Sequence, residues 1–131
     1  MLEVDPPEDK PFLYRETTEK IIGAAFEVHR ELGYGFLERV YQRALQVELL
    51  SEGVSAEIER RIQVHYKGVI VGDYDAELIV AEVVAVELKV NPQYDKGDEA
   101  QLLNELKATG LKVGLLINFG RTKVEYKRLV F

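Results

Sequence analysis

The sequence predicts one α/β domain, built as a mixed sheet with helices on both faces. Apolar residues recur at helical spacing up to residue 51, which indicates two helices at the start. From residue 57 onward the period changes to two, which indicates strands. A third helical segment then separates two strongly apolar strands, as in a parallel strand-helix-strand crossover. The predicted element order is α-α-β-β-β-α-β-β.

The two opening helices are expected at 18–32 and 37–51. On the first, Ile22, Phe26 and His29 fall on one side, and Thr17 or Thr18 is suited to cap its amino end. The sequence "GYG" at 33–35 ends it, because glycine tolerates the left-handed conformation at a helix C-terminus. Residues 1–12 are acidic and rich in proline, and they are expected to form a flexible leader before a single domain at 13–131.

Five strands and one helix are expected in the rest of the chain. A half-buried strand at 57–66 turns at Lys67-Gly68 into a second strand at 69–80, and a short turn at Ala81-Glu82 leads to a third. The expected elements that follow are the third strand at 83–90, a helix at 98–109, a strand at 112–119 and a strand at 122–131. On the second strand, strict alternation places Asp75, Glu77 and Ile79 on one face, opposite Ala76 and Leu78.

The length, the cysteine count and the net charge of the chain exclude several kinds of protein. The chain has 131 residues, no cysteine and a net charge of −6. These values exclude disulfides and thiolate metal sites, favour a cytoplasmic protein and argue against a non-specific DNA coat. No apolar run approaches the roughly 20 residues of a membrane-spanning helix. Residues 107–131 nevertheless hold six basic residues and one acid, which leaves room for contact with phosphates or for an ordinary solvated strand.

The third strand, "VVAVELKV", carries two charges in an apolar run. Glu87 and Lys89 share a face by the strand period, and an unpaired buried ion would cost several kcal/mol. Their charges are compensated by each other, by other side chains or by a metal ion. If the second and third strands form a hairpin, Glu77 lies near Glu87 on this face. Two carboxylates and an ammonium there suit a hard cation such as Mg²⁺, whereas an exposed strand with simple ion pairs is the alternative.

These motifs resemble a known family. An acid at Glu77, followed ten residues later by the E-x-K of Glu87 and Lys89, resembles the PD-(D/E)XK nuclease superfamily. "GFLERVY" at 35–41 and "AQLLNELKATGLKVGLLINFG" at 100–120 resemble its GxxExxY branch. The resemblance implies a restriction-endonuclease-like fold and a Mg²⁺- or Mn²⁺-dependent nuclease acting on DNA or RNA.

The resemblance also implies roles for individual residues. Glu77 and Glu87 correspond to the metal-binding acids and Lys89 to the catalytic lysine. Glu38 corresponds to a helix glutamate near the metal, and Gln101 to the first residue of a Q-x-x-x-Y motif beside the active site. The chain departs from the pattern twice: Glu77 replaces the more usual aspartate, and Glu105 occupies the tyrosine position.

These departures motivate a second reading, a catalytically weak or inactive protein that binds nucleic acid or a protein partner. A purely structural or assembly role is the third. The chain has little basic surface for binding nucleic acid. We expect a homodimer or a protein partner to supply the missing binding surface.

Overall fold

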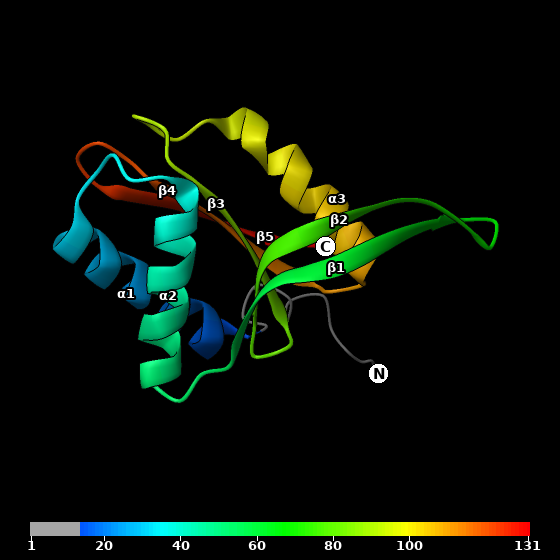
Figure 1. The fold of residues 1–131 in the computed structure, drawn as a ribbon, viewed down its shortest axis with the longest axis horizontal. Coiled ribbons are helices and arrows are strands. Elements are labelled where there is room, and N and C mark those ends of the chain that lie inside the picture. Colours follow the sequence, from blue (N-terminus) through cyan, green and yellow to red (C-terminus); the bar gives the residue numbers. More distant parts are fainter. Residues whose placement is uncertain (1–13) are drawn as a thin grey trace.

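The computed structural model describes residues 14–131, so the predicted leader at 1–12 lies outside the described residues. The elements follow in the predicted order of two helices, three strands, one helix and two strands, which confirms the α/β fold class (Figure 1). They are α1 (Arg15–Leu32), α2 (Glu38–Ser51), β1 (Ala56–Tyr66), β2 (Val69–Val80), β3 (Val84–Lys89), a 3₁₀ turn η2 (Lys96–Asp98), α3 (Glu99–Thr109), β4 (Val113–Phe119) and β5 (Val124–Val130).

The five strands form one mixed sheet in the order β1-β2-β3-β4-β5. Neighbouring strands are antiparallel except β3 and β4, which are parallel and are joined through α3. This confirms the predicted crossover. β4 is buried at every position, because it lies inside the sheet between two helical layers.

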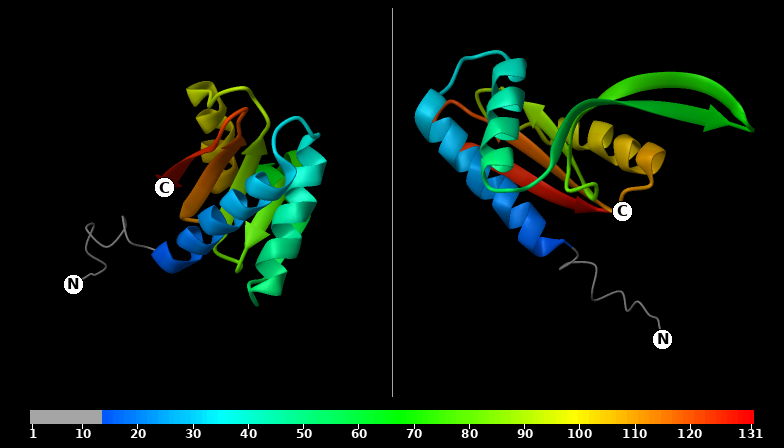
Figure 2. Two further views of the ribbon diagram at one scale, coloured as in Figure 1. Left: turned by 90° about the vertical axis from the view of Figure 1, so that its left-hand side faces the viewer. Right: turned by 60° about the horizontal axis from the view of Figure 1, so that its bottom comes forward.

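Helices cover the two faces of the sheet and give it two cores (Figure 2). α1 and α2 lie on one face, where Tyr41, Leu45 and Phe119 are fully buried among aliphatic side chains. α3 lies on the other face, where Leu102 and Leu106 pack on the sheet. None of the described helices is long and apolar enough to cross a membrane.

The start of α1 differs from its prediction. The helix begins at Arg15, three residues before the expected 18, and its N-cap is Tyr14 in a left-handed conformation. The Thr18 hydroxyl donates to the Arg15 carbonyl inside the first turn, so Thr18 does not cap the helix. A threonine in the first turn can bond backward to the chain as readily as it can cap, and spacing alone does not separate the two.

The strict alternation predicted for β2 is wrong around Glu77. Ala76 packs on the α3 side of the sheet, whereas Leu78 packs on the α1 and α2 side. The opposite residue, Glu59 of β1, has a φ of 56°, and neither Glu59 nor Glu77 takes part in the ladder between β1 and β2. This local distortion changes the face that the flanking side chains occupy.

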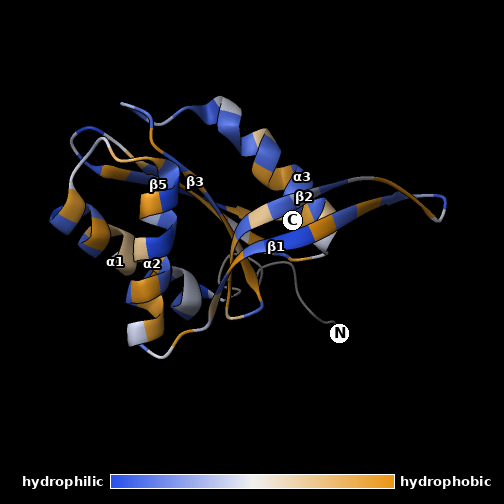
Figure 3. Ribbon diagram, viewed as in Figure 1, coloured by the Kyte–Doolittle hydropathy of each residue, from blue (hydrophilic) through white to orange (hydrophobic). Residues whose placement is uncertain are grey.

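Beyond Ile62 and Tyr74, β1 and β2 continue as a two-stranded arm that projects from the body (Figure 1). Its tip exposes apolar residues, which Figure 3 shows along the strands. These are Val64, Tyr66, Val69, Ile70 and Val71. The prediction of a half-buried strand therefore holds only near the body of the molecule, because no helix covers the arm at its tip.

Candidate active site

The candidate site lies where β2 and β3 separate. The two strands pair at three positions, from Val80 opposite Val84 to Leu78 opposite Val86, and the described ladder stops before Glu77. The Glu77 carboxylate accepts a hydrogen bond of 2.9 Å from the Leu88 backbone N–H. On the other side, the Gln42 amide of α2 donates to the Glu77 carbonyl at 2.8 Å. Glu77 therefore bridges the opening between the strands and is held in place from α2.

Burial and neighbouring charge act on Glu77 together. Burial, followed by the charge of Glu87, raises the pKa of Glu77 to about 8, while the Leu88 N–H acts in the opposite direction. The protonated form of this carboxyl is therefore favoured near neutral pH. A cation bound here would favour the ionised form, since a nearby positive charge lowers a carboxyl pKa.

Glu87 is 3% exposed and lies on the α3 side of β3, the face that also carries the buried Ala85. Its electrostatic neighbour on α3 is Glu105, which is 1% exposed and whose Oε2 is buried without a hydrogen-bond partner among the described residues. Burial and then the Glu105 charge raise the pKa of Glu87, and burial raises the pKa of Glu105. Two adjacent buried carboxylates repel each other when both are ionised, so the protonated form is favoured in this pair.

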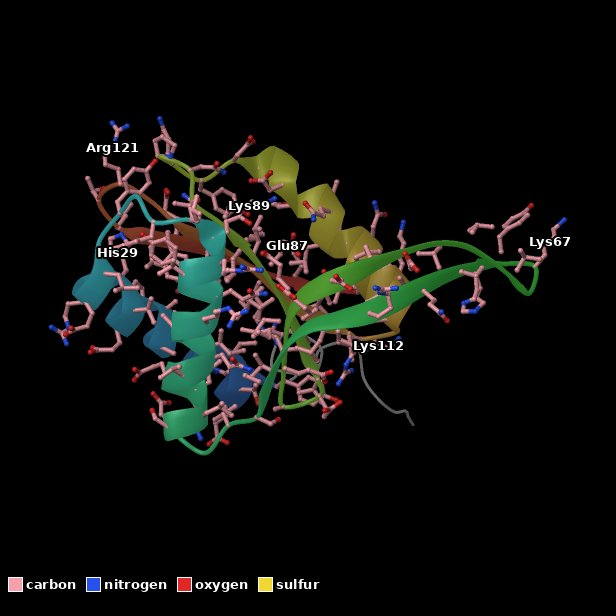
Figure 4. All side chains as sticks on the ribbon, in the orientation of Figure 1. His29, Lys67, Glu87, Lys89, Lys112 and Arg121 are labelled. Carbon is pink, nitrogen blue, oxygen red and sulfur yellow. The ribbon has the colours of Figure 1, made fainter. Side chains whose placement is uncertain are left out.

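Lys89 completes the face predicted from the strand period. Its Nζ donates to the Gln101 Oε1 on α3 at 3.3 Å. Its positive charge also lowers the pKa values of Glu77 and Glu87, which places it within electrostatic reach of both. Figure 4 shows Glu87 and Lys89 following each other along β3. Among the described residues, the structure shows no ion pair between Glu87 and Lys89, so the partners of these charges come from α3.

Glu38, the first residue of α2, lies at the edge of the same cluster. It is exposed, and its charge raises the pKa values of Glu77 and Glu87. A surface cavity of about 270 Å³ is lined by Glu38, Glu77 and Asp75 together with other polar residues of α2 and β1. Arg61 of β1 donates to the Asp75 carboxylate at 3.1 Å, so Asp75 is paired with the neighbouring strand.

The donor set fits a metal ion only in part. Within residues 14–131, no group of three Asp, Glu, His or Cys side chains is arranged to hold one ion. Mg²⁺ usually takes one or two carboxylates and keeps several waters, so Glu77 and Glu87 match the number of protein ligands that it requires. Burial and the neighbouring acids raise the pKa values of both carboxyls, and a bound cation would lower them.

Two residues of the site were not predicted as such. Glu105 was treated only as a missing tyrosine, although its position four residues after Gln101 places both on one side of α3. Gln42 carried no sequence signal beyond its place one turn after Glu38. The Tyr41 hydroxyl donates to the Gly33 carbonyl. His29 contacts the Gly120 carbonyl at 2.8 Å, in a structural role.

Comparisons with known proteins identify the fold and the family of the chain. A solved structure described as the crystal structure of SSO0001 superposes with a TM-score of 0.54 at 16% identity, covering 91% of this chain and 60% of that one. This likeness shows the fold, and the chain spans about three fifths of the matched protein. No curated protein sequence matches the chain. The family model described as PD-(D/E)XK nuclease superfamily matches residues 15–129. The chain therefore belongs to the PD-(D/E)XK nuclease superfamily.

Proposed function

We propose that this protein is a Mg²⁺- or Mn²⁺-dependent nuclease of the GxxExxY branch that hydrolyses phosphodiester bonds in DNA or RNA. The observation that carries the proposal is the convergence of Glu77, Glu87 and Lys89 where β2 and β3 separate. Glu77 and Glu87 would hold the ion. When bound, the ion supplies charge stabilisation at the phosphate and a more acidic water.

The residues of the chain have distinct tasks in this reaction. Lys89 places an ammonium beside the two acids, where it stabilises the negative charge that develops on the phosphate oxygens. Gln101 positions Lys89 through its Oε1. Glu38 adds negative charge at the edge of the cluster, which favours cation binding. Water oxygen adds to phosphorus and releases one proton to solvent, the bond to one ester oxygen breaks, and the leaving oxygen receives a proton from solvent.

A second function is favoured by one observation. Glu105, which stands at the tyrosine position of the related motif, is a second buried acid whose charge raises the pKa of Glu87. Glu87 must be ionised to act as an anionic ligand, so the neighbouring acid weakens cation binding near neutral pH. The alternative is thus a weak or inactive nuclease that binds nucleic acid or a protein partner. Self-association would add binding surface in either case.

Cleavage of a labelled panel of single-stranded DNA, duplex DNA and RNA tests the proposal. We expect products with Mg²⁺ or Mn²⁺, none with EDTA, and a strong loss in Lys89→Ala. Lys112→Ala is the matched control, because Lys112 is an exposed lysine in the turn after α3 and does not line the cavity at Glu38 and Glu77. Binding without cleavage on every substrate would support the alternative. Equal cleavage by Lys89→Ala and the wild type would refute the assigned site.

A further inference from the structure

A second cavity lies beside the candidate site, beneath the projecting arm. Its volume is about 580 Å³, within the roughly 300–1,000 Å³ typical of small-molecule sites. Gln63, His65 and Tyr74 line it from the arm, and Asn104 and Lys107 line it from α3. The arm passes over the carboxyl-terminal half of α3, so the cavity has two walls that come from distant parts of the sequence (Figure 2).

The chemistry of this cavity contrasts with that of the acidic site. Among the described residues, no Asp or Glu lines it, although the chain has a net charge of −6. The amides of Gln63 and Asn104 each offer donors and an acceptor, as the edge of a nucleobase requires. Lys107 offers a positive charge for a phosphate. The lining therefore combines groups that recognise a base with one that recognises the backbone.

Tyr74 connects the cavity to the candidate site. Its side chain lines the cavity, and its hydroxyl is buried without a hydrogen-bond partner among the described residues. Burial, and then the charges of Glu105 and Glu87, raise the pKa of Tyr74 to about 12, so Tyr74 is within electrostatic reach of both acids. Gln101, which contacts Lys89, precedes Asn104 and Lys107 on the same helix by about 4.5 and 9 Å along the axis.

We propose that this cavity binds one unpaired nucleotide of the strand that is cleaved, next to the phosphate held at Glu87 and Lys89. The inference rests on the proposed function, because the bound nucleotide is assigned to the strand whose phosphate is cleaved. A base enters a cavity between the arm and α3 only when its edge is unpaired and its faces are unstacked. A single strand, or the frayed end of a duplex, meets this condition, whereas an intact duplex does not.

Binding measured without metal tests this subsite separately from cleavage. Fluorescence anisotropy in EDTA would use labelled single-stranded DNA, single-stranded RNA and a blunt duplex. The variants are Asn104→Ala and Lys107→Ala, with melting curves to confirm that each folds. Lys20→Ala is the matched control, since it removes one exposed positive charge from α1 on the opposite face of the sheet.

We expect a single strand to bind more tightly than the duplex. Asn104→Ala should weaken binding roughly fivefold or more, and Lys107→Ala should lower the slope of log affinity against log salt by about 0.7. Lys20→Ala should match the wild type. Equal binding by the wild type and both cavity variants would overturn the subsite, as would tighter binding of the duplex or no binding of any probe. Weakened binding by both variants in a protein that cleaves nothing would support the subsite and refute the nuclease.

Discussion

Replacing Glu77 with glutamine tests how strongly the folded protein raises the pKa of the Glu77 carboxyl. Burial and the Glu87 charge raise the pKa of Glu77 from 4.5 to about 8. The folded protein thus keeps a proton that the unfolded chain releases near its ordinary pKa. The stability from this group is fully present below the unfolded pKa and is lost as the pH rises toward the folded pKa. Glutamine does not titrate, and it keeps an oxygen that can accept from the Leu88 N–H.

The size of the stability loss follows from the difference between the folded and unfolded pKa values of Glu77. One pKa unit corresponds to about 1.4 kcal/mol, so Glu77 removes roughly 3 to 4 kcal/mol of wild-type stability between about pH 5 and about pH 8. Urea unfolding in EDTA at several pH values in this range measures it. The loss of unfolding free energy with rising pH should be smaller in Glu77→Gln than in the wild type by this order of magnitude. Parallel pH profiles for the two proteins would refute the reasoning, because they would show that Glu77 titrates as in water.

Three further substitutions test other parts of the account. Lys89→Ala should lower turnover by about 10²–10³ while the melting midpoint stays unchanged, and a lowered midpoint with activity lost only through unfolding would indicate a structural ion pair instead. Gln101→Ala should reduce turnover less than Lys89→Ala does, since it contacts only the lysine; a loss as large as that of Lys89→Ala would contradict a positioning role. Gly114→Ala should lower the free energy of unfolding by about 1–3 kcal/mol, because its Cβ would lie 2.9 Å from the buried Leu102 Cδ1, and an unchanged urea midpoint would contradict this.

Much of the fold was predictable from residue periodicity. The order of helices and strands follows from the change of period near residue 57, and the shared face of Glu87 and Lys89 follows from the strand period. The exchange of faces at Ala76 and Leu78 was not predictable. It accompanies a left-handed conformation at Glu59, a residue type that gives no local signal for it.

Only those residues of the candidate site that lie on the strands were predictable from the sequence. Glu77 and Glu87 lie on sequence-adjacent strands, so a hairpin was enough to expect them together. The partner of Glu87 depends on how α3 packs across the sheet, and no local pattern specifies that Glu105 is buried against it. The arm shows the converse: its alternating pattern predicts burial, but burial requires a second element, and none covers Tyr66 or Val69 among the described residues.

The central claim is that Glu77 and Glu87 bind a divalent cation. Calorimetric titration of the metal-free protein with Mn²⁺ tests it most directly, with Glu87→Gln as the variant and Glu52→Gln, an exposed residue at the end of α2, as the control. The account predicts one binding event in the wild type and in Glu52→Gln, with release of protons because buried carboxyls must ionise, and its loss in Glu87→Gln. Equal Mn²⁺ affinity in Glu87→Gln and the wild type, or no binding to either, would contradict it.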